Sequence, residues 1–181
     1  MKKISEDGWH SLAKQRNSTH FNQRPNNEIN LLVIHNISLP AQQFGTRYID
    51  DLFMGCLDCN AHESFSELEG VQVSAHFLIR RDGGLIQYVS CDDRAWHAGL
   101  SEFEGRENCN DFSIGIELEG SDFQAFTEAQ YQSLISLTQD IMLHYPQITP
   151  QRITGHSDIA PARKTDPGPY FDWKSYLSQL S

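Results

Sequence analysis

The 181-residue chain contains no apolar run that approaches the roughly 20 residues needed to cross a bilayer. It is also short of positive charge, with 14 lysines and arginines against 24 aspartates and glutamates and a formal net charge of −10. An acidic surface repels nucleic acid and anionic membranes, so we expect neither as a partner. A small anionic ligand held by a few local cations is compatible with this charge.

The sequence also shows no internal repeats, low-complexity tracts or linkers. Its first residues, MKKISEDGWHSLAKQ, contain lysines, but Glu6 and Asp7 stand where the apolar segment of a signal peptide would lie. We therefore expect a cytoplasmic protein. The length suits one domain over residues 1–181, which can form a core without disulfide or metal staples. We also expect this domain to be a monomer.

Cysteine is scarce, and the four that occur are Cys56, Cys59, Cys91 and Cys109. In a reducing compartment we expect them to be thiols. The segment CLDC at 56–59 has the spacing of redox and zinc motifs, and His62 follows it. Because no second pair with this spacing occurs, we interpret these cysteines as incidental thiols. A redox or structural-zinc protein built on this motif is the alternative.

Four segments have the patterns of β-strands. The continuous apolar run at 31–35 is typical of a buried central strand, and residues 74–90 predict a hairpin that turns at 82–84. Residues 112–120 alternate, so that three aliphatic side chains share one face while Ser113, Gly115, Glu117 and Glu119 share the other. Residues 152–156 predict a further short strand.

Helix signals alternate with these strands. The strongest begins at a capping box formed by Thr127 and Gln130, continues as an apolar stripe that predicts core packing, and ends before Pro146. A closing helix is expected after its cap Asp172, and another short helix near residues 4–15. The alternation predicts a single α/β domain with a central mixed β-sheet flanked by helices.

Residues 38–70 have a different character. They contain proline, glycine, asparagine and scattered aromatic residues, with one short helix expected at 48–53. A stretch of this length with little regular structure is usually functional or mobile. We interpret it as an irregular lid or substrate wall.

The residues with the clearest chemistry follow two of the predicted strands. His35 ends the first apolar run and His156 ends the last strand, where α/β sheets place their sites. Asp166 precedes Pro167, which confines the backbone of the aspartate to extended geometry. A lone histidine at a strand end is more often structural, but two with such an aspartate are typical of a zinc site that keeps a position open for water.

Hydrolysis at such a site also needs a base and a second cation. Glu117 and Glu119 project from the same face of their strand, so spacing alone does not distinguish them. The neighbouring Gly115 leaves space beside Glu117. Lys164 lies two residues before Asp166 and therefore near the metal, although a solvated surface charge is the simpler interpretation of a lysine.

Five segments of the chain together resemble one known family: VIHNISLP, SAHFLIRRDG, RAWHAG, CNDFSIGIELEG and GHSDIAPARKTDPGP. They resemble the AmpD-type N-acetylmuramoyl-L-alanine amidases of the zinc amidase and peptidoglycan-recognition superfamily, from about residue 8 to residue 173. The resemblance implies that His35, His156 and Asp166 bind Zn²⁺. It also implies that Glu117, rather than its neighbour, orients and deprotonates the zinc water and that Lys164 stabilises the oxyanion.

The resemblance further implies a substrate. The family cleaves the amide between 1,6-anhydro-N-acetylmuramic acid and the L-Ala of the stem peptide, so we expect an anhydro-muropeptide as the partner. This step recycles cell-wall fragments in the cytoplasm and affects β-lactamase induction indirectly. A non-catalytic peptidoglycan-binding module and a periplasmic murein amidase of the same fold are the alternatives.

Three residues are candidate substrate contacts. Asn36 can hydrogen-bond the peptide, Trp96 can stack on the sugar, and His97 can contact polar atoms; for Trp96 a place in the core is an equal alternative. Members of the family often have arginines for the peptide carboxylates, but Gln72 and Asn108 stand near those positions in this chain.

Two arginines and two histidines also lie near these motifs. Arg94 and Arg106 are the nearby cations that can compensate for the missing arginines. His62 and His76 are interpreted as structural histidines.

Overall fold

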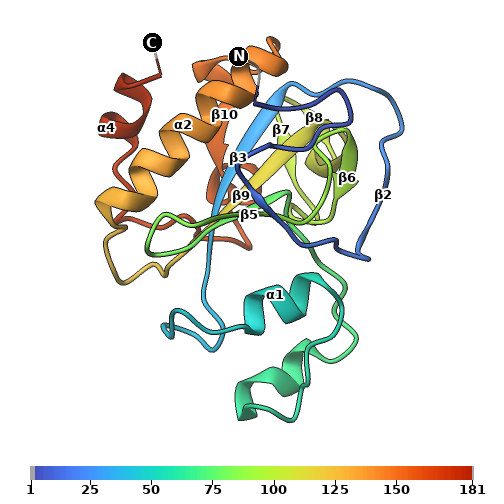
Figure 1. The fold of residues 1–181 in the computed structure, drawn as a ribbon, viewed down its shortest axis with the longest axis vertical. Coiled ribbons are helices and arrows are strands. Elements are labelled where there is room, and N and C mark those ends of the chain that lie inside the picture. The colour runs from blue at the N-terminus through green and yellow to red at the C-terminus, as the bar shows by residue number, and fades with distance from the viewer. Residues whose placement is uncertain (1–2, 181) are drawn as a thin grey trace.

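The computed structural model describes residues 3–180, which form a mixed six-stranded sheet between helices (Figure 1). The strands follow the order β1-β5-β4-β9-β3-β10 across the sheet. β4 and β5 pair antiparallel, and the other neighbours pair parallel. The bounds are β1 Lys14–Gln15, β3 Leu31–Ile37, β4 Phe77–Ile79, β5 Leu85–Gln87, β9 Ser113–Glu119 and β10 Ile153–Gly155. The predicted single α/β domain with a central mixed sheet is therefore the observed fold.

Short elements complete the sheet edges and loops. Two small ribbons form where β2 Phe21–Gln23 pairs with β6 Asp93–Ala95 and β7 Glu102–Phe103 pairs with β8 Arg106–Glu107. Three 3₁₀ turns are η1 Glu63–Leu68, η2 Cys109–Asp111 and η3 Pro150–Arg152. The η2 turn ends two residues before the start of β9.

The helices are α1 Tyr48–Phe53, α2 Glu128–His144, α3 His156–Ile159 and α4 Trp173–Ser178. The predicted capping box opens α2, since the Thr127 hydroxyl accepts from the Gln130 N–H and the Gln130 side chain accepts from the Thr127 N–H. Asp172 caps α4 as expected. None of the helices within residues 3–180 combines the length and apolar character needed to span a membrane.

One face of the sheet packs on α2 and α4, which lie side by side in Figure 1. Ile34, Ile114 and Ile116 of the two central strands share a buried cluster with Leu134 of α2 and Tyr176 of α4. Because side chains alternate along a strand, His35, Gly115 and Glu117 point to the opposite face. The candidate site is therefore on the side of the sheet away from α2.

The helix expected near residues 4–15 is not formed, and this prediction is wrong. Ile4 instead bridges to His10, and the segment ends as strand β1 beside β5. Gly8 has a φ of +76°, which is incompatible with a helix, and its carbonyl accepts from the side-chain amide of Gln87 while the His10 N–H donates to that same side chain. The contacts with the sheet thus override local helix propensity.

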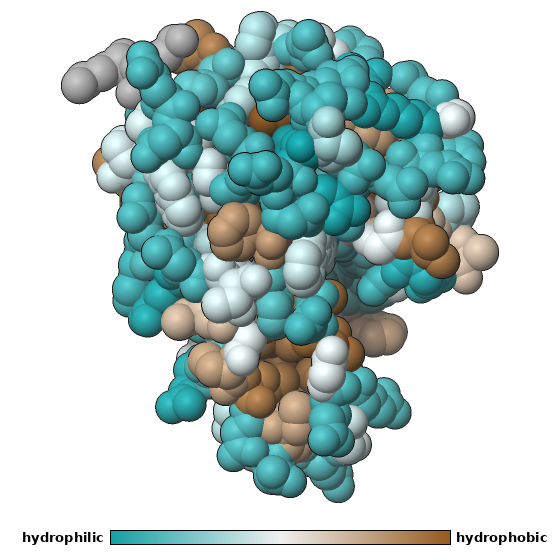
Figure 2. All heavy atoms as spheres, turned by 90° about the vertical axis from the view of Figure 1, so that its right-hand side faces the viewer, coloured by the Kyte–Doolittle hydropathy of each residue, from teal (hydrophilic) through white to brown (hydrophobic). Residues whose placement is uncertain are grey.

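Residues 38–70 form a wall that projects from the body of the molecule, at the bottom of Figure 1. The helix predicted at 48–53 is present as α1, and it buries Ile49, Leu52 and Phe53 in a cluster with Leu78 of β4 and Tyr88, the residue after β5. Figure 2 shows apolar side chains gathered where this wall meets the body. Partly buried apolar residues that pack on this cluster are Ile37, Leu39, Met54, Leu57 and Val73.

Candidate metal centre and active site

Three residues that are far apart in sequence bring one donor atom each to a common point. His35 Nδ1 lies 3.0 Å from His156 Nδ1, and each nitrogen lies 3.1 Å from Asp166 Oδ2. His35 lies within β3, two residues before its end, while His156 is the first residue of α3 directly after β10. The Asp166 loop is tied to α3 by a hydrogen bond of 2.9 Å from the Ser157 N–H to the Asp166 carbonyl. The structure thus brings together the three predicted metal ligands.

The hydrogen bonds around this group fit a bound metal. His156 Nε2 lies 3.0 Å from the Ala98 carbonyl oxygen, which can only accept, so Nε2 carries the proton and Nδ1 presents its lone pair. Two imidazole lone pairs and one carboxylate oxygen form a donor set typical of catalytic metal sites. Within the described part of the chain it is the one group of three or more histidine, cysteine or acidic residues with this geometry, and CLDC is not part of it.

The environment holds these side chains in the forms that ligate metals. Burial lowers the pKa of His35 to about 4, so its imidazole is neutral at physiological pH. Burial opposes ionisation of Asp166, but the imidazoles of His156 and His35 close to its Oδ2 outweigh that effect and hold the pKa of the carboxyl below its ordinary value. Neutral imidazoles and an ionised carboxylate are the states that metal binding requires.

Glu117 stands beside this group, because it is the register partner of His35 in the β3–β9 pair. Its side chain is buried, and its Oε2 atom has no hydrogen-bond partner among the described residues. Burial raises the pKa of Glu117 well above its ordinary value, Asp166 raises it further and Lys164 opposes the rise. Since buried polar atoms are normally paired, this oxygen is available for a ligand or a water.

Glu119, two residues further along the same strand, is fully engaged. Its carboxylate accepts from the Gly45 N–H at 2.6 Å, from the Arg81 N–H at 3.1 Å and from the Arg80 guanidinium at 3.1 Å. The contact with Gly45 attaches the wall of residues 38–70 to the sheet. The structure therefore distinguishes the two glutamates, which spacing could not, and it places Glu117 beside the metal-ligating group of His35, His156 and Asp166.

A pocket of about 190 Å³ opens onto the group. It adjoins a hollow of about 370 Å³, and the two cavities share Asn36, Lys164 and Asp166. Lys164 forms no ion pair within residues 3–180 of the structure, so its ammonium is available to the pocket. Because they share these three residues, the two cavities adjoin at the Asp166 side of the group.

The predicted substrate contacts Asn36, Trp96 and His97 all line this pocket. The Asn36 side chain donates to Asp122 at 2.7 Å. The Trp96 ring stacks on His20 with an interplanar angle of 9°, and its indole N–H donates to Asn22 at 2.6 Å. Trp96 is half-buried at the pocket rather than in the core. The contact of Asn36, Trp96 and His97 with substrate remains a prediction.

The residues near the expected arginine positions lie outside this pocket. Gln72 lines a separate hollow beside His20, and Asn108 adopts a φ of 60° at the start of η2. Arg94 pairs with Asp111 at 2.5 Å and Arg106 with Glu28 at 2.7 Å, so both candidate cations already have acidic partners.

The two histidines interpreted as structural have the contacts of that role. His62 caps η1 by accepting from the Ser64 N–H, and the buried His76 accepts from the Gly115 N–H through Nδ1.

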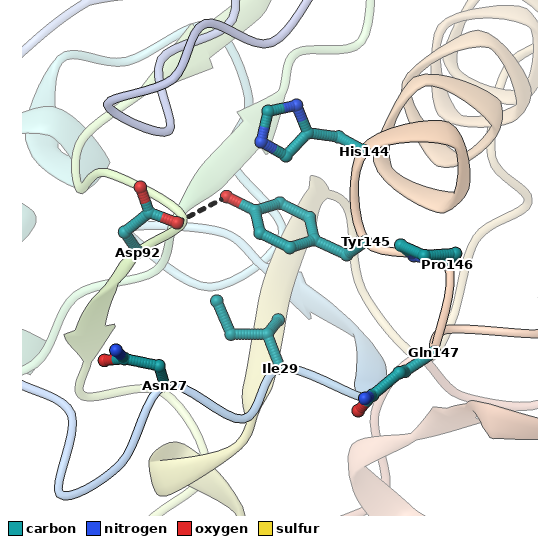
Figure 3. Close-up of a pocket in the computed structure, with 7 residues that line it drawn as sticks. All are labelled: Asn27, Ile29, Asp92, His144, Tyr145, Pro146 and Gln147. Atoms are coloured by element: carbon teal, nitrogen blue, oxygen red, sulfur yellow. Dashed lines mark hydrogen bonds between the residues drawn. The ribbon is translucent and has the colours of Figure 1, made fainter.

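A larger hollow of about 510 Å³ lies at the end of α2, on another part of the molecule (Figure 3). Its one carboxylate, Asp92, faces the Tyr145 hydroxyl, which donates to it at 2.8 Å. The other lining residues are Asn27, Ile29, His144, Pro146 and Gln147. None of them belongs to the metal-ligating group, so cavity size alone does not locate the reactive site.

Buried imidazoles and a carboxylate beside an unpaired glutamate suit hydrolysis, in which a base removes a proton from water near a positive centre.

The class of protein follows from its similarity to a known family. The model of the family described as Amidase_2, N-acetylmuramoyl-L-alanine amidase, matches residues 25–169. The chain therefore belongs to the N-acetylmuramoyl-L-alanine amidase family, as its motifs indicate, and it is an amidase of that type.

Individual proteins of this family are similar to the chain over nearly its whole length. The chain is 57% identical over 183 residues to the 1,6-anhydro-N-acetylmuramyl-L-alanine amidase AmpD of Haemophilus influenzae, covering 99% of this chain and 100% of the relative. A crystal structure of an AmpD selenomethionine derivative matches with a TM-score of 0.94 and 52% identity, covering 97% of this chain and 98% of the other.

A third similar protein was solved with a ligand. It is the amidase AmiD of Escherichia coli in complex with the substrate anhydro-N-acetylmuramic acid-L-Ala-D-gamma-Glu-L-Lys. It matches with a TM-score of 0.62 and 35% identity, covering 83% of this chain and 57% of AmiD.

Proposed function

We propose that this amidase is zinc-dependent and hydrolyses the amide between 1,6-anhydro-N-acetylmuramic acid and the L-Ala of the stem peptide. The observation that carries the proposal is the convergence of His35 Nδ1, His156 Nδ1 and Asp166 Oδ2 beside the unpartnered Oε2 of Glu117. Three donors from two imidazoles and a carboxylate suit Zn²⁺ and leave room for a fourth ligand.

When bound there, Zn²⁺ would lower the pKa of a coordinated water to about 7 and polarise a carbonyl. Glu117 would take the proton of the attacking water and pass it to the leaving amine. Burial raises the pKa of this carboxylate and makes it a stronger base than an exposed glutamate. An amide is a poor electrophile, so both the proton transfer and the activated carbonyl are needed.

Lys164 would stabilise the negative charge that develops on the amide oxygen. It lines the same pocket as Glu117, and it has no acidic partner among the described residues that would neutralise its ammonium. A preorganised charge of this kind is worth about 3 to 4 kcal/mol in the transition state.

The substrate is inferred from the relatives. The Haemophilus influenzae relative is named for the 1,6-anhydro substrate, and the AmiD complex contains an anhydro-muramic tripeptide. A role in cytoplasmic muropeptide recycling, with an indirect effect on β-lactamase induction, belongs to the same proposal. The complete donor set favours an enzyme over the alternative of a non-catalytic peptidoglycan-binding module.

The proposal is tested by elemental analysis combined with an amidase assay. We expect one equivalent of zinc and release of the L-Ala-containing peptide from an anhydro-muropeptide, with activity abolished by a chelator and restored by Zn²⁺. Turnover that survives complete removal of zinc would contradict zinc dependence. Faster turnover of polymeric murein than of the anhydro-muropeptide would instead favour the alternative of a periplasmic murein amidase.

A further inference from the structure

A series of buried hydrogen bonds starts at His35 Nε2, the ring nitrogen that does not face the proposed metal. His35 Nε2 lies 2.9 Å from His97 Nδ1, and His97 Nε2 lies 3.2 Å from the Ser113 hydroxyl. The Ser113 hydroxyl in turn lies 2.6 Å from the Cys109 carbonyl oxygen. All four residues are buried, so these groups have each other rather than solvent as partners.

The Cys109 carbonyl at the far end of this series fixes the direction of every hydrogen bond in it. A carbonyl oxygen only accepts, so the Ser113 O–H donates to Cys109, and the Ser113 oxygen is left to accept from His97 Nε2–H. A neutral His97 protonated at Nε2 has a lone pair on Nδ1, which accepts from His35 Nε2–H. His35 protonated at Nε2 presents the lone pair of its Nδ1 toward Asp166 and His156.

The residue after His97 supports the second histidine ligand. The Ala98 carbonyl accepts from His156 Nε2 at 3.0 Å. The backbone of this dipeptide is held by Asn110, whose side-chain oxygen accepts from the His97 N–H at 3.1 Å and the Ala98 N–H at 2.8 Å. One buried segment therefore orients both imidazoles of the donor set.

Gly115 provides the space for the His97 ring. A Cβ atom at this position would lie 2.5 Å from Cγ and Nδ1 of His97, which is closer than carbon atoms approach each other. The space that the sequence indicated beside Glu117 is thus filled by the ring of His97. Gly115 sits in a regular strand, so the glycine is needed for this close approach rather than for its backbone conformation.

We infer that His97, oriented by Ser113 and Asn110, is a positioning residue that sets the tautomer of His35 and so presents His35 Nδ1 to the metal. This inference rests on the proposed zinc dependence. Both ring nitrogens of His97 are used within the protein, so a substrate contact through them would require these hydrogen bonds to break. Partners of this kind outside the ligand set typically change metal affinity by about 10- to 100-fold when they are removed.

The test uses the full chain and three variants. His97→Phe keeps a ring but removes both nitrogens, and Ser113→Ala removes the hydroxyl that directs them. Ser133→Ala is the matched control. Ser133 lies on α2, away from the site, and its hydroxyl likewise donates to a backbone carbonyl, that of Gly83, at 2.7 Å. Thermal unfolding of each variant verifies that it folds.

Two readouts are measured. Chelator competition should show zinc affinity about 10- to 100-fold weaker for His97→Phe, a smaller loss for Ser113→Ala and none for the control. Long-range ¹H–¹⁵N spectra of the zinc-free protein should show His35 as the Nε2–H tautomer in the wild type and a mixture of tautomers in His97→Phe. A merely structural role would not change this spectrum.

The outcomes separate this inference from the proposed function. Wild-type zinc affinity in a folded His97→Phe, or a wild-type His35 protonated at Nδ1 in the zinc-free protein, would overturn the inference. A wild-type chain that binds no zinc would refute the proposed function instead, and the tautomer of His35 would still decide whether His97 orients it.

Discussion

Glu117 and Glu119 lie on one strand, point to one face and are both buried, yet their surroundings are opposite. Glu119 has three hydrogen-bond donors around its carboxylate, including Arg80, which also pairs with Asp50 at 3.0 Å. Glu117 has an oxygen without a partner among the described residues and a second carboxylate, Asp166, nearby. Hydrogen-bond partners, rather than burial, therefore distinguish the engaged carboxylate of Glu119 from the available carboxylate of Glu117.

The two glutamates also connect different parts of the molecule. Glu119 attaches the wall of residues 38–70 through Gly45, and the Asp50 carboxylate that shares Arg80 also accepts from the Tyr88 hydroxyl. Glu117 instead adjoins His35 and faces the pocket. Substitutions at the two positions should therefore affect different properties. A substitution of Glu119 should lower stability, and a substitution of Glu117 should lower turnover.

The largest effect is expected where the metal-ligating group itself is broken. Asp166→Ala removes the one charged donor from the three-ligand set, so we expect loss of bound zinc and of all measurable turnover. Zinc content by elemental analysis and the rate of peptide release check this. Stoichiometric zinc in the purified variant would show that Asp166 is not a ligand.

Glu117→Ala should keep zinc and lose catalysis. General-base catalysis is worth roughly 10²- to 10⁴-fold in rate, and kcat should fall by that factor. Stability should not fall with it, because the substitution removes a buried carboxylate that lacks a partner. Parallel measurements of kcat, zinc content and thermal unfolding test the separation, and a variant with normal kcat would assign the proton transfer to another group.

Glu119→Ala should have the opposite profile. Removal of its buried carboxylate leaves the donors of Gly45, Arg81 and Arg80 with fewer partners, which should lower the free energy of unfolding by about 1 to 3 kcal/mol. We expect kcat to change much less than in Glu117→Ala. Denaturant unfolding and kinetics of the pair measure this, and a selective loss of kcat at unchanged stability would reverse the roles of the two glutamates.

The pH dependence of stability should also report on Glu117. The folded-state pKa of Glu117 is raised by burial, so the zinc-free folded protein binds a proton that the unfolded chain releases above about pH 4.3. This contribution favours the folded state at low pH and is lost as pH rises toward the folded-state pKa. Glu117→Gln should abolish this loss, and unfolding of the zinc-free wild type and variant across pH 4 to 8 tests it.

The smallest effect is expected at the CLDC motif. Cys56 is exposed, and neither it nor Cys59 joins a metal-ligating group of described residues. Replacing both with serine should leave zinc content and activity unchanged. A variant that loses zinc would support the alternative of a structural-zinc motif.

Much of this architecture could be predicted from sequence because its signals are local. The apolar run before His35, the alternation around Glu117 and the capping box at Thr127 each specify an element without knowledge of the rest of the chain. The three residues of the candidate metal centre are also indicated, since histidines near strand ends and a proline-restricted aspartate are visible in sequence.

The remaining features depend on contacts between distant segments. The expected helix near the start of the chain is replaced because Gly8 and His10 bond to Gln87, which lies about eighty positions away in sequence. The difference between the two glutamates and the link from His97 to Ser113 likewise exist only in the folded chain. The segment CNDFS contains Asn110 and Ser113, but its spacing alone gives no sign that it orients a histidine.

The most direct test of the central claim is a crystal structure of the zinc-loaded protein with diffraction recorded at the zinc absorption edge. We expect one anomalous peak bounded by His35 Nδ1, His156 Nδ1 and Asp166 Oδ2, with the Glu117 carboxylate facing it. A peak at Cys56 and Cys59, or no peak at the histidines in a fully active crystal, would contradict it.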